Sequence, residues 1–259
     1  MQNLLTFLGT SDAQGVPRML CRCPVCTSSD PIHKRRRPSV RFETEDAIIL
    51  IDVSPDFREQ FLQYGNELIP DAVLITHCHN DHIAGFGDFG DLCFWNKKRS
   101  RIISPEENIR LLRSCYSYLN ESRGIEYIAT DAWKIGKWQI RFHRVNHGFN
   151  GFSYGIRFHS EEGAWAYVPD AFGMTEEQLE PFTDMDLLVL GTSYYREHAD
   201  RTRRSVYDVT EAIEIKEKVR PSRLLLTHLS HDIDIPLHSL RLPPGIQFAY
   251  DGMQLAFPF

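Results

Sequence analysis

The sequence lacks the long apolar run that a membrane-spanning helix requires, and it lacks the basic excess of a dedicated nucleic-acid binder. A span needs about 20 consecutive apolar residues, and no stretch reaches that length. The 259 residues are 42% hydrophobic and 25% charged, which is typical of a globular protein, and the formal net charge is −6. Residues 1–9 are too short for a signal peptide. We therefore expect a soluble cytoplasmic protein that does not bind membranes, and the acidic balance disfavours nucleic acid as a partner.

Internal repeats, low-complexity tracts and linker-like breaks in composition are also missing. We therefore predict one domain over residues 1–259, with a cysteine-rich loop at about 10–38. No export signal accompanies the six cysteines, and this combination favours reduced thiols or a metal site over disulfides. One local basic stretch, residues 33–37 (HKRRR), is interpreted as a solvated loop, and the alternative is a positive rim that attracts phosphate.

Apolar patterns predict a mixed α/β chain. Short buried runs predict strands at 4–8, 47–53, 72–75, 164–168, 186–190 and 223–227. Alternating patterns predict strands from Trp138 and Phe152, and a turn at Asp251 and Gly252 predicts a closing hairpin of 246–249 and 253–257. Helical spacing predicts helices at 56–63, 87–95, 105–119 and 206–219. Two mixed sheets packed face to face, with helices outside, would accommodate these elements.

The most informative motif directly follows the apolar run 72–75. Residues 77–82 read H-C-H-N-D-H, which places three imidazoles and one carboxylate within one short stretch. Burial would strip each imidazole of its hydration, and the cluster would repel itself if it were protonated. A divalent cation removes both problems, because neutral imidazole and ionised carboxylate are among its preferred ligands. The motif therefore predicts a metal site with His77, His79, Asp81 and His82 as ligands and Cys78 as a spacer.

Three later residues stand where buried strands open onto loops, namely His147, Asp170 and His228. Two cations about 3.5–4 Å apart need ligands from several strands and usually a bridging carboxylate, which the first motif alone does not provide. Each residue by itself has an ordinary interpretation as a surface histidine or a turn aspartate, but together they complete a ligand set. Asp52, after another buried strand, is predicted to orient a metal-bound imidazole or to cap residues 54–56.

A second cluster is formed by Cys21, Cys23 and Cys26, which fall within six residues. Three thiolates at this spacing can surround one tetrahedral ion, and a structural zinc site is closed by a fourth protein ligand. No fourth cysteine lies nearby, and His33 is one candidate for the missing ligand.

Residues 76–85 (THCHNDHIAG) resemble the T-H-x-H-x-D-H-x-x-G signature of the metallo-β-lactamase superfamily. His147, Asp170 and His228 match the remaining ligands of that superfamily in order and context. The resemblance implies an α/β fold, the αββα sandwich, with a dinuclear site of Zn²⁺ or Mn²⁺ between the sheets. By this resemblance His77, His79 and His147 would hold one ion. Asp81, His82 and His228 would hold the other, and Asp170 would bridge them.

Residues 9–17 (GTSDAQGVP), 21–26 (CRCPVC) and 226–231 (LTHLSH) resemble the PhnP family of phosphoribosyl 1,2-cyclic phosphate phosphodiesterases. This resemblance covers nearly the whole chain and assigns His231 as the fourth ligand of one structural Zn²⁺. It also implies a homodimer, for which Phe89, Phe94 and Trp95 would offer a surface unless they form a core face.

One feature departs from the PhnP pattern. The family has a histidine shortly before its final long helix, and the corresponding position here is Ser205 or Val206. His198 is a candidate substitute through a different loop path. Arg203, with Arg201 and Arg204, is another, because guanidinium groups bind phosphate oxygens.

These observations predict a metal-dependent hydrolase. The leading interpretation is a phosphodiesterase that cleaves a small, anionic, cyclic or nucleotide-like phosphodiester with a metal-bound hydroxide. Asp81, His198 and Arg203 are the candidate catalytic residues. The alternatives are a ribonuclease Z-like nuclease, a carbonyl ester or thioester hydrolase, and a metal-binding protein without catalytic activity.

Overall fold

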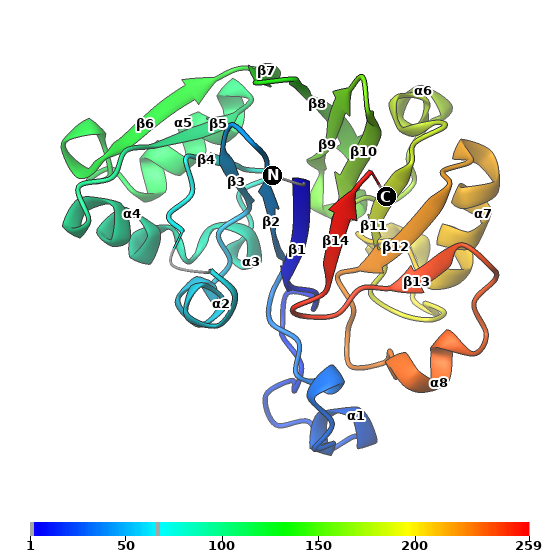
Figure 1. The fold of residues 1–259 in the computed structure, drawn as a ribbon. Helices are drawn as coiled ribbons and strands as arrows, with labels where there is room; N and C mark the ends of the chain where they lie inside the picture. Colours follow the sequence, from blue (N-terminus) through cyan, green and yellow to red (C-terminus); the bar gives the residue numbers. More distant parts are fainter. Residues whose placement is uncertain (1–2, 66–67, 259) are drawn as a thin grey trace.

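The computed structural model describes residues 3–65 and 68–258, and these residues form two seven-stranded β-sheets packed face to face (Figure 1). The strand order is β14-β1-β2-β3-β4-β5-β6 in the first sheet and β13-β12-β11-β10-β9-β8-β7 in the second. Helices cover the outer face of each sheet (Figure 1). The predicted αββα sandwich is therefore confirmed.

The strands of the first sheet are β1 (Asn3–Gly9), β2 (Ser39–Glu43), β3 (Ile48–Ile51), β4 (Ala72–Leu74), β5 (Ser100–Ser104), β6 (Ile125–Ala129) and β14 (Gln254–Phe257). Those of the second are β7 (Ala132–Ile135), β8 (Trp138–Asn146), β9 (Phe152–Ser160), β10 (Gly163–Val168), β11 (Leu187–Gly191), β12 (Arg223–Thr227) and β13 (Ile246–Phe248). On the first sheet lie α2 (Phe57–Tyr64), α3 (Asn80–Ile83), α4 (Phe86–Trp95) and α5 (Glu106–Cys115). Beside the second lie α6 (Glu176–Leu179), α7 (Val209–Val219) and α8 (Ile235–Ser239).

Each sheet is half antiparallel and half parallel, and this arrangement positions the predicted ligands. The strands β3 to β6 run parallel in the first sheet, and β10 to β13 run parallel in the second. The carboxyl ends of parallel strands meet at one edge, where loops are free to carry polar side chains. Asp52, His77, Asp170 and His228 follow β3, β4, β10 and β12 at these edges.

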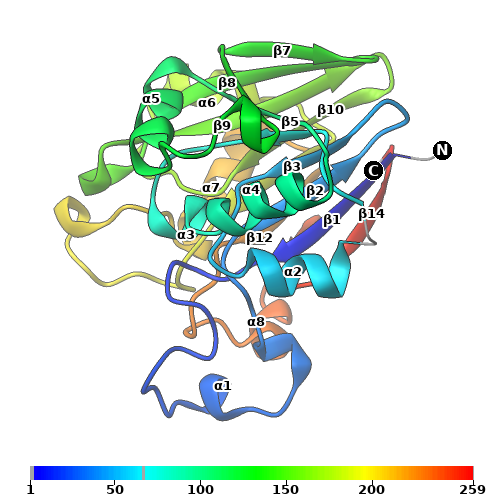
Figure 2. The same cartoon turned by 90° about the vertical axis from the view of Figure 1, so that its left-hand side faces the viewer.

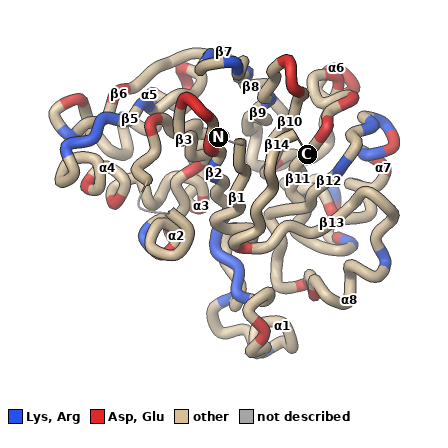
Figure 3. The backbone as a smooth tube through the Cα atoms, viewed as in Figure 1, with Lys and Arg blue, Asp and Glu red and all other residues tan. Residues whose placement is uncertain are grey.

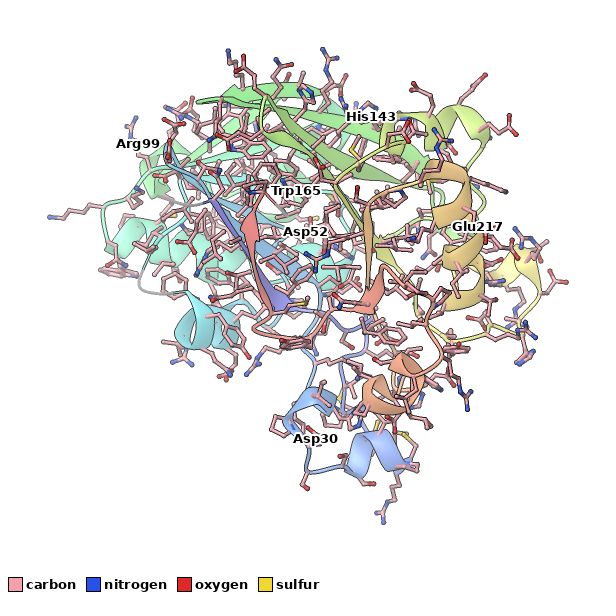
Figure 4. The ribbon with its side chains drawn as sticks, turned by 45° about the vertical axis from the view of Figure 1, so that its right-hand side comes forward. Asp30, Asp52, Arg99, His143, Trp165 and Glu217 are labelled. Atoms are coloured by element: carbon pink, nitrogen blue, oxygen red, sulfur yellow. The ribbon has the colours of Figure 1, made fainter. Side chains whose placement is uncertain are left out.

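An aromatic core joins the two sheets. The rings of Phe158 and Trp165 stack with centroids 4.1 Å apart, and Phe42 of the first sheet packs edge-on against Trp138 of the second at 5.0 Å. Such large buried rings contribute most of the apolar area that holds two layers together. Trp165 of this core and Asp52 at the end of β3, both labelled in Figure 4, are fully buried.

Residues 10–38 leave the first sheet as a projecting loop between β1 and β2 (Figure 2). The loop carries the one-turn helix α1 (Pro24–Thr27) and the 3-10 turn η1 (Pro31–His33). Its own apolar cluster is small and consists of Val16, Val25 and Cys26 with two further cysteines. The loop therefore needs anchors other than a hydrophobic core.

The predicted closing hairpin of residues 246–249 and 253–257 is wrong. β13 pairs with β12 in the second sheet, whereas β14 pairs with β1 in the first. A turn does form at Gly252, whose φ is +86°. However, the Asp251 carboxylate accepts hydrogen bonds from Thr10 N and Oγ1, both at 2.9 Å, and from Arg36 N at 2.8 Å. The turn is thereby tied to the projecting loop, and the chain crosses from one sheet to the other instead of folding back.

Replacing Asp251 should test this tie. Asp251→Ala leaves the Thr10 and Arg36 amides without their acceptor, and we expect the free energy of unfolding to fall by about 2 kcal/mol. Urea denaturation measures the change. The matched control is Asp184→Ala, because Asp184 is exposed and forms a surface ion pair with Arg220 that contributes about 1 kcal/mol at most. Equal effects of the two substitutions would contradict a special role for Asp251.

In the part of the chain that the structure describes, no helix is long and apolar enough to cross a bilayer.

Candidate metal centres

Seven side chains from four separate segments of the chain converge between the sheets. Four of them lie directly after β4 and in the short helix α3, and the others follow β8, β10 and β12. They are His77, His79, Asp81, His82, His147, Asp170 and His228, and all except His79 are buried. The structure therefore brings together the complete set that the sequence singles out, and their role as ligands stays a prediction.

The histidines form two groups on either side of one carboxylate. In one group the ligand atoms of His77, His79 and His147 lie within 4.8 Å of one another, with His77 Nε2 2.9 Å from His79 Nδ1. In the other group, His82 Nε2 and His228 Nε2 lie 3.3 Å and 3.5 Å from Asp81 Oδ2.

The Asp170 carboxylate reaches both groups. Its Oδ2 lies 2.9 Å from His82 Nε2. Its Oδ1 lies 3.3 Å from His228 Nε2 and 3.7 Å from His147 Nε2. A carboxylate within reach of both groups is the ligand that a pair of cations would share.

Contacts at the Nδ1 atoms of His147 and His82 fix the orientation of these two imidazoles. His147 Nδ1 lies 2.7 Å from the Ser205 carbonyl oxygen, which can only accept, so Nδ1 carries the proton and Nε2 is free to bind a metal. His82 Nδ1 lies 2.7 Å from Asp52 Oδ2. Asp52 also accepts from the Thr76 amide and hydroxyl, at 2.8 and 2.7 Å. Asp52 therefore orients His82 and makes no cap at residues 54–56.

Three buried polar atoms test whether a cation fits here. His82 Nε2, His228 Nε2 and Asp170 Oδ2 make no hydrogen bond of good geometry among the described residues, although the first and the last of these atoms lie only 2.9 Å apart. A buried polar atom without a partner costs about 1–3 kcal/mol. All three atoms face the space between the two groups, and a divalent ion would satisfy them. The donor set of imidazole nitrogens and carboxylate oxygens suits Zn²⁺ or Mn²⁺.

The pKa shifts within the cluster also favour bound cations. Burial alone would lower the pKa of His82, but Asp81, Asp52 and Asp170 outweigh it and raise that pKa well above its usual value. Burial would raise the pKa of Asp170, but His228 and His82 hold it below its ordinary range. Burial lowers the pKa of His77. The buried carboxylates therefore require nearby positive charge, which metal ions would supply.

The three cysteines of the projecting loop gather around His231. The Sγ atoms of Cys21, Cys23 and Cys26 lie 3.1, 3.5 and 3.6 Å from His231 Nδ1. A tetrahedral zinc with Zn–S bonds of about 2.3 Å and a Zn–N bond of about 2.0 Å would separate sulfur from nitrogen by about 3.5 Å. The geometry fits one closed zinc site. His33, the other candidate for the fourth ligand, is buried elsewhere and faces Asp234 at 4.0 Å.

The non-metal candidates lie outside both clusters. His198 and Arg203 are exposed, and Arg203 belongs to the 3-10 turn η5 (Arg201–Arg203). This loop packs against the turn after His147, because the Phe149 amide donates to the Arg204 carbonyl at 3.2 Å.

Arg204, the third arginine considered for phosphate binding, is engaged by its own neighbours. Arg204 is buried, its guanidinium forms ion pairs with Asp208 and Glu211, and it lies over the Phe172 ring at 4.5 Å. Arg201 is also paired with Glu211, although it remains exposed. These contacts commit Arg204 to the structure of its own loop.

Sequence reasoning missed Ser193. Its Oγ lies 3.2 Å from His228 Nδ1, so it contacts the ring nitrogen opposite the one that faces the carboxylates. Ser193 stands two residues after β11, and the same strand-end position singles out the predicted ligands. That position was the one signal available for it in the sequence.

Comparisons with known proteins agree with this geometry. The family model for the β-lactamase superfamily domain matches residues 48–229. An octanoyltransferase of Porphyromonas gingivalis is 31% identical over 266 residues, which cover 96% of this chain and 50% of that protein. The chain thus spans about half the length of this relative.

Two solved structures extend the comparison. A crystal structure described as a new diphosphatase from the PhnP family has a TM-score of 0.89 at 32% identity, covering 100% of this chain and 99% of that one. The short form of human tRNase Z has a TM-score of 0.75 at 16% identity, with 99% and 100% covered, and this level of similarity concerns the fold alone.

Proposed function

Because this chain belongs to the metallo-β-lactamase superfamily and is a PhnP-like hydrolase, we propose that it cleaves a small phosphodiester or diphosphate. The position of the Asp170 carboxylate carries the proposal. It lies within 2.9–3.7 Å of histidines from both groups, as a shared ligand of two cations would. When bound, two divalent ions supply a water of lowered pKa and neutralise phosphoryl oxygens. The diphosphatase named among the similar structures supports phosphorus as the site of attack.

The chain's own residues would hold and orient the reacting groups. The Ser205 carbonyl, Asp52 and Ser193 fix the imidazoles of His147, His82 and His228. This leaves the other ring nitrogens directed at the cations and removes the entropy cost of ordering them during the reaction. Asp81 belongs to the proposed ligand set and is the remaining candidate catalytic carboxylate.

We propose that the exposed loop of residues 198–205, next to His147, borders the substrate-binding site. A phosphate that enters over His147 would meet the loop of residues 198–205, which carries two exposed candidates. We assign phosphate binding to Arg203 and protonation of the leaving group to His198, because a guanidinium suits the first task and an imidazole the second.

Two further proposals concern the rest of the molecule. One structural Zn²⁺ would be held by Cys21, Cys23, Cys26 and His231. A homodimer would use Phe94 and Trp95, which are exposed at 38% and 76% at the end of α4. Phe89 is fully buried in the core and takes no part in such a surface.

Other hydrolase substrates have weaker support. The net charge of −6 disfavours a nuclease that grips a long RNA, and the human tRNase Z shares only the fold. The octanoyltransferase is twice as long as the matched region, so its named activity does not pass to this chain by similarity. An ester or thioester substrate is the alternative to test directly.

The test pairs metal analysis with a substrate panel. We expect about three metal ions per chain and turnover of bis(p-nitrophenyl) phosphate that a chelator abolishes and Mn²⁺ or Zn²⁺ restores. p-Nitrophenyl phosphate, p-nitrophenyl acetate, an acyl thioester and a precursor tRNA serve as comparison substrates. Hydrolysis of the thioester or the acetate without any of the diester would overturn the proposal.

A further inference from the structure

The two metal centres share one short segment of the chain. His228 directly follows β12 with its backbone in the left-handed region, at a φ of +58°, and His231 of the cysteine cluster follows three residues later. Between them, the Leu229 amide donates to the Thr10 carbonyl at 2.7 Å, and the Ser230 amide donates to the Ser193 carbonyl at 3.0 Å. A displacement of this segment would therefore move ligands of both centres.

Arg35 holds this segment from the side of the projecting loop. It is only 2% exposed. Its Nη2 donates to the carbonyl oxygens of Ser230 and Ile233, at 2.8 and 3.0 Å. Its backbone pairs with Val16 in both directions, at 2.8 and 2.9 Å, and so joins the strand leading to β2 to the start of the cysteine loop. Figure 3 shows this basic segment running between the projecting loop and β2.

These carbonyl contacts do not neutralise the positive charge of the buried Arg35 guanidinium. Its Nε and Nη1 have no hydrogen-bond partner among the described residues, and a buried cation needs compensating negative charge. Burial lowers the pKa of Arg35 to about 10, which leaves the guanidinium protonated at neutral pH, and Asp251, Asp12 and Cys26 are the groups that oppose this shift most. A zinc bound by three thiolates and one neutral imidazole carries a net charge of −1. Arg35 would compensate that charge.

We propose that Arg35 is a positioning residue that couples the two centres, so that zinc in the cysteine cluster raises the metal affinity of the active-site position at His228. This inference rests on the proposed function for the identity of the active-site metals, but its test measures metal binding and needs no substrate. Zinc would draw His231 toward the projecting loop. Arg35 would hold the Ser230 and Ile233 carbonyls in place. Together these contacts would keep His228 in its left-handed conformation. Loss of a contact that orients a metal ligand typically weakens binding by about 10–100-fold.

The test compares Arg35→Met with Arg22→Met. Arg22 is exposed between Cys21 and Cys23, so its replacement removes the same charge next to the cluster without breaking a buried contact. Zinc release to 4-(2-pyridylazo)resorcinol is followed for each protein. Mn²⁺ is then titrated, with electron paramagnetic resonance detection, into protein dialysed until only the cysteine-bound metal remains. We expect Arg35→Met to release zinc at least about tenfold faster and to raise one of the two Mn²⁺ dissociation constants about tenfold, with Arg22→Met unchanged.

Two further variants keep the proposal open to refutation if Arg35→Met does not fold. Arg35→Lys retains the charge and one carbonyl contact, and it should restore zinc retention at least in part. Cys23→Ser removes the zinc while Arg35 is intact, and it should raise the same Mn²⁺ dissociation constant. Wild-type zinc release in Arg35→Met, or unchanged Mn²⁺ affinity in Cys23→Ser, would overturn the coupling. Normal coupling in a protein that hydrolyses neither phosphodiesters nor diphosphates would refute the proposed function alone.

Discussion

Asp170→Asn is expected to lower kcat for bis(p-nitrophenyl) phosphate by about 10³-fold while the fold persists. The amide has the volume of the carboxylate, so packing after β10 is preserved. It lacks the second anionic oxygen, however, and cannot neutralise cations on both sides. Bound active-site metal should fall from about two ions per chain to about one or none. Steady-state kinetics, elemental analysis and circular dichroism measure the three effects.

His79→Ala should give a comparable loss of turnover. His79 is the one partly buried residue among the seven proposed active-site ligands, so its removal should disturb the fold less than that of the other six. Asp184→Asn is the control, because this carboxylate is exposed and remote in sequence from every strand end that carries a ligand. Full activity in Asp170→Asn or in His79→Ala would refute the dinuclear model.

Cys23→Ser is expected to lower the melting temperature by about 10 °C and to release one metal ion. Metal binding contributes directly to folding free energy, and a loss of about 3 kcal/mol corresponds to a shift of this size in a chain of this length. The projecting loop has little apolar surface to replace that contribution, because its cluster contains only Val16 and Val25 besides cysteines. Differential scanning calorimetry and elemental analysis measure the two effects.

The active-site pair should persist in Cys23→Ser at saturating Mn²⁺, since all seven proposed ligands remain and only their affinity falls. Cys115→Ser is the matched control, because Cys115 is exposed at the end of α5 and lies outside the cluster. Unchanged metal content in Cys23→Ser would show that the cysteines hold no zinc.

The fold was predictable where local patterns are strong. The apolar runs 72–75 and 223–227 contain β4 and β12, and each leads directly to a histidine of the site. The strand β2 (Ser39–Glu43) was missed because Arg41 interrupts its apolar pattern. Arg41 is nevertheless buried, and its guanidinium binds Glu43 and the Tyr64 carbonyl. A long-range partner of this kind has no local signal in the sequence.

Element ends and pairings were less predictable for the same reason. The helix predicted at 206–219 begins at Val209, because Asp208 caps it and the Glu211 carboxylate accepts a hydrogen bond from the Asp208 amide. The helix predicted at 105–119 ends at Cys115. The turn at Asp251 was recognised, but its carboxylate binds residues more than 200 positions away, and this contact determines which sheet the last strand joins.

Within the site, the sequence indicates the residues that would bind metal and misses those that support them. Histidine and aspartate at strand ends are recognisable by type and position. Ser193, the Ser205 carbonyl and the two carbonyls held by Arg35 act through contacts between separate segments. A serine or a backbone carbonyl has no distinctive residue type, so its role emerges only from the three-dimensional arrangement.

The pairing of β14 with β1 has a consequence for synthesis on the ribosome. All eleven proposed ligands lie between Cys21 and His231, so they are translated before β14. The strand β1 is made first, and its outer edge stays unpaired until Gln254–Phe257 emerge and add antiparallel to it. An open edge strand is a site of unwanted pairing between chains. The metal centres therefore have all their ligands available while the first sheet is still incomplete, and the last strand protects that sheet from association with neighbouring nascent chains.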